Sequence, residues 1–130
     1  MLNKTLGIRH IALKVKNIEN CKHFYHRILQ MDIDWEPDPE NIYLTNGHDN
    51  LALHYSDDIS THKNNGCLDH FGIVVKNKSD VDKWYDHVSE NGVKIQQGIK
   101  DHRDGSRSFY CYDPDQNVIQ IIWIPNISRK

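Results

Sequence analysis

Two stretches of the chain alternate apolar and polar residues, at 9–15 and at 68–75. Alternation with a period of two is typical of a strand that buries one face. After each stretch the apolar spacing changes to that of a helix, within residues 18–29 and 81–88. The pattern therefore predicts a strand followed by a helix, twice. The apolar strand positions are Ile11, Leu13, Val15, Phe71, Ile73 and Val75.

The second strand and helix repeat the first. Residues 10–28 read HIALKVKNIENCKHFYHRI and residues 70–88 read HFGIVVKNKSDVDKWYDHV, at a constant offset of 70 − 10 = 60 positions. Without any gap, His10 falls on His70, and the Lys-Asn pair that ends the first strand falls on a second Lys-Asn pair. Internal repetition of this kind indicates two copies of one supersecondary unit.

Short strand candidates follow each helix, and turn-forming residues separate them. At the second helix, Ser79 followed by Asp82 resembles a capping box, and Asn91-Gly92 predicts the end of the helix. The order of elements is therefore βαβββ, twice. The strand candidates lie at 31–35, 42–45, 50–55, 93–96, 106–112 and 117–123, and the turns include Asn46-Gly47 and Asp113-Pro114-Asp115.

This order predicts one α+β domain over residues 1–130. Repeat one spans about 7–56 and repeat two spans about 67–125. A helix that buries its apolar stripe on one face of a sheet leaves the other face free. We therefore expect the repeats to form a curved mixed sheet of two half-barrels, with the helices outside and a trough for a ligand inside.

The composition is that of a globular chain, with 38% hydrophobic and 26% charged residues. A formal net charge of -2 gives no reason to expect nucleic acid as a partner. No apolar run approaches the roughly 20 residues that span a bilayer, so we expect no membrane partner either. The three cysteines form no CxxC pair, which argues against a disulfide framework and favours the cytoplasm.

Strand alternation predicts that His10 and Lys14 face the trough, opposite the apolar positions of their strand. The repeat places His70 on the same face of the second copy. Two neutral imidazoles can bind a divalent transition metal, usually with oxygen ligands that complete the shell. The two histidines are therefore candidate metal ligands.

The segments RHIALKV, LDHFGIVV and YDPDQNVIQII resemble the vicinal oxygen chelate superfamily, and the resemblance extends from about Gly7 to Pro125. This superfamily contains glyoxalase I, extradiol dioxygenases, fosfomycin-resistance thiol transferases and bleomycin-resistance proteins. The resemblance implies metal ligands at His10, His70 and Gln120. It also implies acidic residues at two last-strand positions, where this chain has Ala52 and Gln120 instead.

Other residues are candidates for substrate binding and proton transfer. The resemblance to the fosfomycin enzymes matches Lys100, Ser108 and Tyr110 to phosphonate-binding positions, and Tyr110 is also a catalytic candidate. Arg103 and Arg107 would suit an anionic group, because guanidinium offers paired donors. His102 could act as a general acid or base near neutral pH. His54, two residues beyond Ala52, is a hypothetical acid–base group or displaced ligand.

The resemblance thus implies a metal-dependent enzyme that coordinates a small oxygenated substrate. Whether it is a lyase, isomerase, dioxygenase or thiol transferase stays open, as does the metal, which could be Mn, Fe, Ni or Zn. The alternative is a metal-free protein that binds or sequesters a small molecule, as bleomycin-resistance proteins do, because Ala52 and Gln120 are what a lapsed metal site would contain. The resemblance also implies a homodimer, in which one site could draw on both chains.

Overall fold

The computed structural model describes residues 3–58 and 68–128. The chain divides into two compact units, Met1–Asp58 and Ile59–Lys130, and each contains one of the repeats. That the two units form a single domain stays a prediction. In the part of the chain that is described, no helix combines the length and apolar character needed to cross a membrane.

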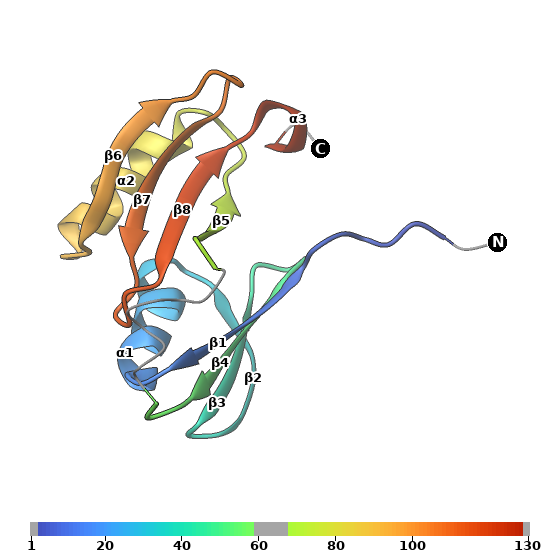
Figure 1. The fold of residues 1–130 in the computed structure, drawn as a ribbon, viewed down its shortest axis with the longest axis vertical. Helices are drawn as coiled ribbons and strands as arrows, with labels where there is room; N and C mark the ends of the chain where they lie inside the picture. The colour runs from blue at the N-terminus through green and yellow to red at the C-terminus, as the bar shows by residue number, and fades with distance from the viewer. Residues whose placement is uncertain (1–2, 59–67, 129–130) are drawn as a thin grey trace. The chain divides into compact units, whose positions relative to one another are not determined.

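The first unit is an open four-stranded mixed sheet with a helical segment packed on one face (Figure 1). The strand order is β1-β4-β3-β2, and β1 runs parallel to β4. Leu13 and Val15 of β1 are buried, as are Phe24 and Tyr25 of the helical segment, whose rings pack edge to face. The elements are β1 His10–Val15, α1 Ile18–Lys22, the π-helix η1 His23–Ile28, β2 Asp32–Asp38, β3 Asn41–Thr45 and β4 Asn50–Tyr55.

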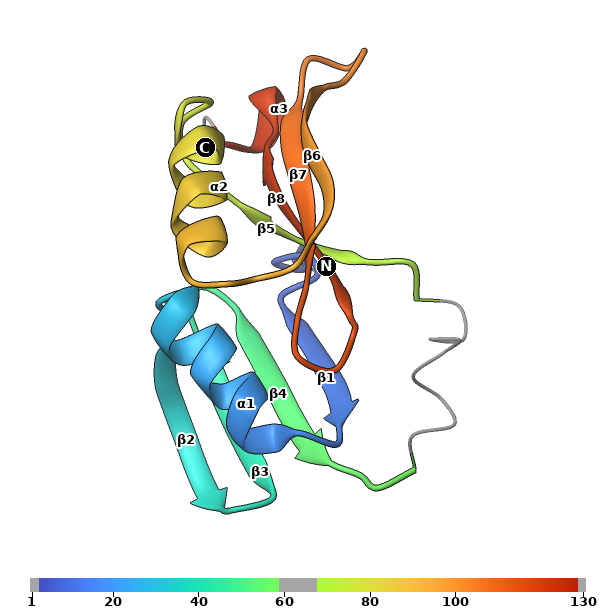
Figure 2. The ribbon, with the colours of Figure 1, turned by 90° about the vertical axis from the view of Figure 1, so that its left-hand side faces the viewer.

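The second unit repeats this plan, with strand order β5-β8-β7-β6 and α2 packed on one face of the sheet (Figure 2). Tyr85 of α2 meets Phe109 of β7 edge to face at 5.3 Å between ring centroids. Ile119 and Ile121 of β8 are buried on the same face. The elements are β5 Phe71–Val74, α2 Asp80–Glu90, β6 Ile95–Asp101, β7 Arg107–Tyr112, β8 Val118–Trp123 and the short α3 Pro125–Ser128.

The predicted α+β fold of two βαβββ repeats is confirmed, with both sheets open. Strand β6 is longer than the apolar pattern predicts, since it continues through polar residues to Asp101. As an edge strand it pairs with β7 alone, so one of its sides stays open to solvent and tolerates polar residues. Strand β2 extends to Asp38 for the same reason.

The predicted capping box at the start of α2 is wrong, although the predicted end at Asn91-Gly92 is confirmed. Ser79 makes no side-chain capping bond. The Asp82 carboxylate accepts hydrogen bonds from Arg107 instead, because a guanidinium offers a charged, two-pronged donor that a backbone amide lacks.

The tight turn between β7 and β8 is also confirmed. The buried Asp113 carboxylate accepts hydrogen bonds from the backbone N–H groups of Asp115 and Asn117, and from the Asn117 side-chain amide at 2.8 Å. Gln116 closes the turn with a φ of 70°. A carboxylate that satisfies several turn donors holds the chain at a defined position, and this turn therefore fixes the register of β8 against β7.

Candidate functional site

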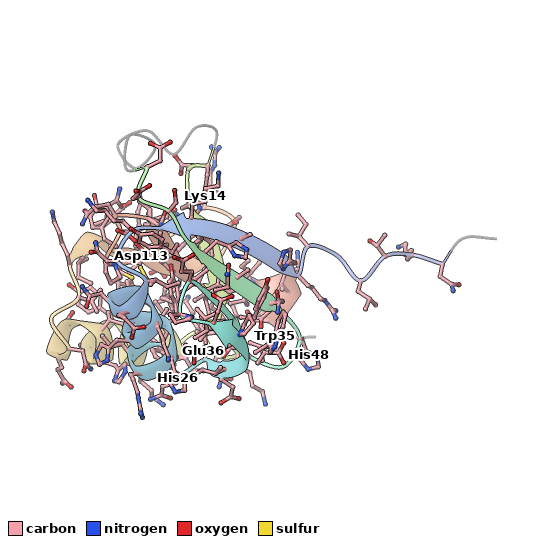
Figure 3. The ribbon with its side chains drawn as sticks, turned by 90° about the horizontal axis from the view of Figure 1, so that it is seen from below. Lys14, His26, Trp35, Glu36, His48 and Asp113 are labelled. Atoms are coloured by element: carbon pink, nitrogen blue, oxygen red, sulfur yellow. The ribbon has the colours of Figure 1, made fainter. Side chains whose placement is uncertain are left out.

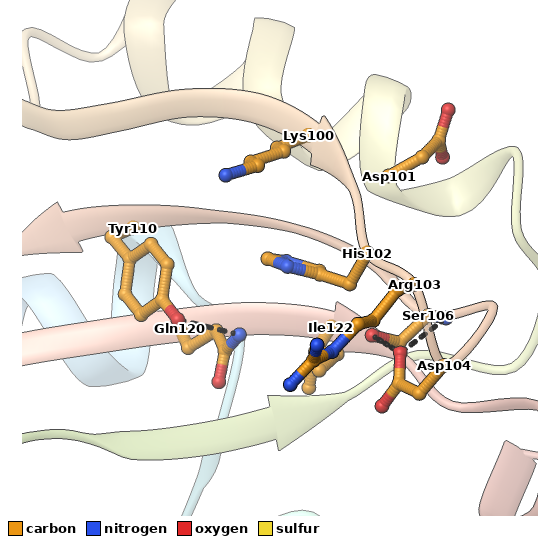
Figure 4. A pocket seen from close by; sticks show the side chains of 9 residues that line it. All are labelled: Lys100, Asp101, His102, Arg103, Asp104, Ser106, Tyr110, Gln120 and Ile122. Carbon is orange, nitrogen blue, oxygen red and sulfur yellow. Dashed lines mark hydrogen bonds between the residues drawn. The ribbon is translucent and has the colours of Figure 1, made fainter.

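A cavity of about 570 Å³ lies on the sheet face of the second unit that α2 does not cover (Figure 4). Register pairs Tyr110 with Gln120 and Ser108 with Ile122, so these four side chains share this face. The β6–β7 hairpin supplies the rest of the lining. The lining residues are Lys100, Asp101, His102, Arg103, Asp104, Ser106, Tyr110, Gln120 and Ile122.

Gln120, only 8% exposed, is held by two hydroxyl groups of the neighbouring strand. Its amide nitrogen Nε2 donates to Ser108 Oγ at 3.0 Å and to Tyr110 Oη at 3.0 Å. The amide oxygen Oε1 receives no hydrogen bond from any residue that the structure describes. Gly72, paired with Gln120 across β5 and β8, keeps space beside this oxygen, since an added Cβ would lie 3.8 Å from it.

His70 stands just before β5 and meets the ring of Tyr110 edge to face, at 5.1 Å between ring centroids. Its Nδ1 lies 2.6 Å from Oδ2 of Asp69. A carboxylate oxygen accepts, so Nδ1 carries a proton, and in the neutral ring Nε2 keeps a free lone pair. Histidines that bind metals are usually oriented in this way, by an oxygen acceptor on the other ring nitrogen.

His102 and Ser108 join the same polar group. His102 Nε2 lies 2.8 Å from Ser108 Oγ, and Ser108 is almost fully buried. At the hairpin turn, hydrogen bonds from the hydroxyl and backbone N–H of Ser106 hold the pKa of the Asp104 carboxyl below its usual range. Lys100 and Arg103 form no ion pair within residues 3–58 and 68–128, so their charges are available to a ligand.

Arg107 does not reach the cavity. It follows the alternation of β7 onto the opposite face, where Nη2 bonds to Asp82 at 2.8 Å and Nη1 bonds to Asp101 at 2.9 Å. The hydrogen bond from Arg107 holds the pKa of Asp82 below its usual range, and the two carboxylates raise the pKa of the guanidinium. Arg107 thus connects α2 to the hairpin.

In the first unit, His10 and Lys14 are exposed on the face of β1 opposite the helices. His10 Nδ1 lies 2.7 Å from Oδ1 of Asn50, its direct neighbour on β4. An amide oxygen only accepts, so His10 has the same arrangement as His70, with Nδ1 bound to an oxygen acceptor and Nε2 open.

His54 lies farther along the same face. Its Nδ1 is 2.6 Å from Asn41 Oδ1, and its ring meets Tyr43 edge to face. Since His54 pairs with Lys14, it lies four ladder positions from His10, or about 13 Å. This separation argues against one ion shared by His10 and His54. On this face Tyr43 also stacks on Trp35 of β2, a residue that is 58% exposed. Trp35 is labelled in Figure 3.

The structure thus brings Lys100, His102, Arg103, Tyr110 and Gln120 around one cavity, with Ser108 behind them. Sequence reasoning missed the supporting residues: Asn50, Asp69 and Gly72. Asp69 adjoins His70 in the sequence, so its role could have been suspected, whereas the other two depend on strand register. Within the described residues, no group of three or more His, Cys, Asp or Glu side chains gathers into a metal centre. Gln120 is not one of these four residue types, although its amide oxygen can also bind a metal ion.

Comparison with known proteins identifies the relatives of this chain. Residues 7–121 match the model of the Glyoxalase/Bleomycin resistance protein/Dioxygenase superfamily. Metallothiol transferase FosB from Staphylococcus saprophyticus is 30% identical over 116 residues, covering 88% of this chain and 75% of that protein. FosB from Staphylococcus haemolyticus is 31% identical over 116 residues, which cover 88% of this chain and 81% of that protein. The solved structure of the fosfomycin resistance protein FosX from Listeria monocytogenes has a similar fold, with a TM-score of 0.75, 16% identity and 98% of this chain covered.

Proposed function

The chain belongs to the Glyoxalase/Bleomycin resistance protein/Dioxygenase superfamily, and we propose that it is a metal-dependent enzyme acting on a small oxygenated substrate. The observation that carries this proposal is the state of Gln120. Its amide nitrogen is taken by two hydroxyl groups and its oxygen is left open beside the cavity. An amide held in this way presents a ligand atom rather than a hydrogen-bond donor.

We assign His10, His70 and Gln120 as the ligands of one divalent ion. Both imidazoles have Nδ1 occupied by an oxygen acceptor and Nε2 open, which fits coordination through Nε2. When bound, the ion would supply Lewis-acid stabilisation of an oxyanion on the substrate. Mn, Fe, Ni and Zn all accept imidazole nitrogen and oxygen ligands, so the donor set does not select among them.

The remaining cavity residues are proposed to bind the substrate. Lys100 and Arg103 provide positive charge for an anionic group, while Tyr110 and His102 provide hydroxyl and imidazole groups for hydrogen bonding and proton transfer. Ser108, behind the cavity wall, positions the Gln120 amide. Arg107 is left out of the proposed site because both sides of its guanidinium are engaged by carboxylates.

Two predicted residues of the first unit keep their proposed roles. Lys14 is a substrate-binding candidate on the open face of β1. His54 is an acid–base candidate whose Nε2 is not used by its bond to Asn41. A homodimer and a cytoplasmic location likewise stay predictions.

Transfer of a thiol to the coordinated substrate is the reaction class that the similarity to the FosB proteins favours. The chain departs from the expected ligand pattern at two points, with Ala52 and Gln120 in place of acidic residues, and of the two only Gln120 still offers a side-chain oxygen. A neutral oxygen ligand contributes no negative charge, so the site should bind metal more weakly than a site with glutamate.

A metal-free small-molecule binding protein is the second candidate. The specific observation in its favour is that Ala52, fully buried, stands where an acidic ligand is expected. In that case the cavity would hold its ligand by Lys100, Arg103 and Tyr110 alone.

Metal content and ligand-dependent stabilisation distinguish the two candidates. The protein is purified without chelator, analysed for metals, and melted with Mn(II), Ni(II), Zn(II) and, without air, Fe(II). Binding to the folded state must raise Tm. His10→Ala, His70→Ala and Gln120→Ala should abolish the increase, whereas the exposed His48→Ala, a matched histidine control, should keep it. No metal and no Tm increase with any ion would leave the binding protein as the function.

A further inference from the structure

Hydrogen bonds connect four side chains of the second unit in one chain along the cavity wall: Tyr110, Gln120, Ser108 and His102. Figure 4 shows the bond between Gln120 and Tyr110. Gln120 Nε2 contacts Tyr110 Oη and Ser108 Oγ, each at 3.0 Å, and Ser108 Oγ contacts His102 Nε2 at 2.8 Å. Gln120 and Ser108 are buried, with 8% and 1% of their surfaces exposed. Water therefore has little access to the middle of this chain.

The number of protons that each group can donate determines which atom donates in each of these hydrogen bonds. An amide nitrogen carries two protons and only donates, so both hydroxyl oxygens must accept from Gln120. Ser108 has one proton of its own, and its other contact among the described residues is His102 Nε2. If Nε2 donated, the buried proton of Ser108 would be left without an acceptor, so Nε2 accepts it. Neutral His102 consequently carries its ring proton on Nδ1. The proton of Tyr110 is not used by Gln120 and is free to point into the cavity that Tyr110 lines.

A carboxylate at position 120 would reverse this direction. Its oxygens only accept, so it would take the protons of Ser108 and Tyr110. Ser108 could then only accept from His102, whose proton would have to lie on Nε2. The hydroxyl of Tyr110 would donate to the carboxylate at position 120 and could no longer donate to a ligand. A single change of residue type thus sets the state of two groups in the cavity.

We propose that Gln120 is a positioning residue that directs this hydrogen-bonded chain, keeping His102 in its Nδ1–H tautomer and leaving the Tyr110 hydroxyl as a donor to the ligand. The ligand atom that meets Tyr110 is then a hydrogen-bond acceptor, such as an ionised oxygen. The proposal deepens the proposed function and rests on it for the role of the cavity. The directions of the hydrogen bonds do not depend on a bound metal, so they are tested in the metal-free protein.

The test is the tautomer of His102 in the full-length, metal-free protein with ¹⁵N-labelled histidine, read from long-range ¹H–¹⁵N spectra at about pH 8.5, where free imidazole is neutral. Wild type should show His102 with the proton on Nδ1, and Gln120→Glu should move it to Nε2. His26 is an internal reference, because its Nδ1 lies 2.7 Å from the Met31 carbonyl oxygen and must donate in both proteins. The signal that disappears in His102→Gln assigns the resonance.

Two further variants test whether the His102 tautomer depends on its hydrogen bond to Ser108 or changes with any substitution in the cavity wall. Tyr110→Phe keeps the contact between Ser108 and His102, so the Nδ1–H tautomer should persist. Ser108→Ala removes that contact, so the preference for Nδ1 should be lost. A wild-type His102 with its proton on Nε2 would overturn the proposal, as would Gln120→Glu with the proton still on Nδ1. These spectra need no metal, so a failure to bind metal would refute the proposed function without changing this result.

Discussion

Removing the Ser108 hydroxyl should destabilise the second unit far more than the loss of one hydroxyl on the surface. Ser108→Ala deletes the acceptor for one Gln120 N–H and the partner of His102 Nε2. Ser108 is 1% exposed and Gln120 8%, so water cannot easily replace the lost acceptor. A buried polar group left without a partner costs about 1–3 kcal/mol. We expect a loss of about 2 kcal/mol in the free energy of unfolding.

Urea unfolding with an unchanged slope, together with a fall in Tm of roughly 6–10 °C, would report this loss. Ser56→Ala is the matched control, since the Ser56 hydroxyl accepts only a long 3.3 Å bond from the Asp58 N–H at an exposed position. It should change stability by less than about 0.5 kcal/mol. Ser108→Ala with Gln120→Leu should recover part of the loss, because both buried partners are then apolar. A loss in Ser108→Ala no larger than in Ser56→Ala would refute the reasoning.

Three further predictions concern other residues of the second unit. Arg107 lowers the pKa of Asp82 in the folded state, so their pairing stabilises the fold above the unfolded pKa near 3.8 and is lost as pH falls through the folded value. In urea unfolding measured at several pH values, Asp82→Asn should remove up to about 1 kcal/mol of this dependence of stability on pH. An unchanged dependence would contradict the pairing. Burial raises the pKa of the Cys111 thiol to about 12, so peptide mapping should find no alkylation of Cys111 at pH 8 in the native protein and full alkylation after unfolding. Gly72→Ala should lower the free energy of unfolding by less than about 1 kcal/mol, because the added Cβ meets its nearest neighbour at 3.4 Å. It should weaken metal binding, measured by calorimetry, because the Cβ takes up space beside Gln120 Oε1. Equal metal affinity in the variant and wild type would show that Gly72 does not keep this space open for a metal ion.

The fold was accessible from the sequence because its signals are local. Alternation in the strands and helical spacing after them predicted nearly every element, and the repeat predicted their order. Edge strands escaped this reasoning, since β6 carries polar residues to its end at Asp101. The capping box at Ser79 failed because Asp82 had a stronger partner 25 positions away, in Arg107, which no local pattern reveals.

The site was accessible in part for the same reason. Alternation along β7 and β8 was enough to place Ser108, Tyr110 and Gln120 on one face. Arg107 was also a predicted binding residue, although adjacent strand residues point to opposite faces and Arg107 precedes Ser108. The acceptors that orient the histidines could not be predicted, since Asn50 reaches His10 only through the register of β1 against β4.

We propose that His10 and His70 bind one metal ion through their open Nε2 atoms. X-ray absorption at the zinc edge of the Zn(II)-loaded protein measures the number of imidazole ligands directly. We expect two imidazoles per ion, with Zn–N distances of about 2.0–2.1 Å, and oxygen for the remaining ligands. In His10→Ala and in His70→Ala the number should fall to one. Two imidazoles persisting in either variant, or none in wild type, would contradict the claim.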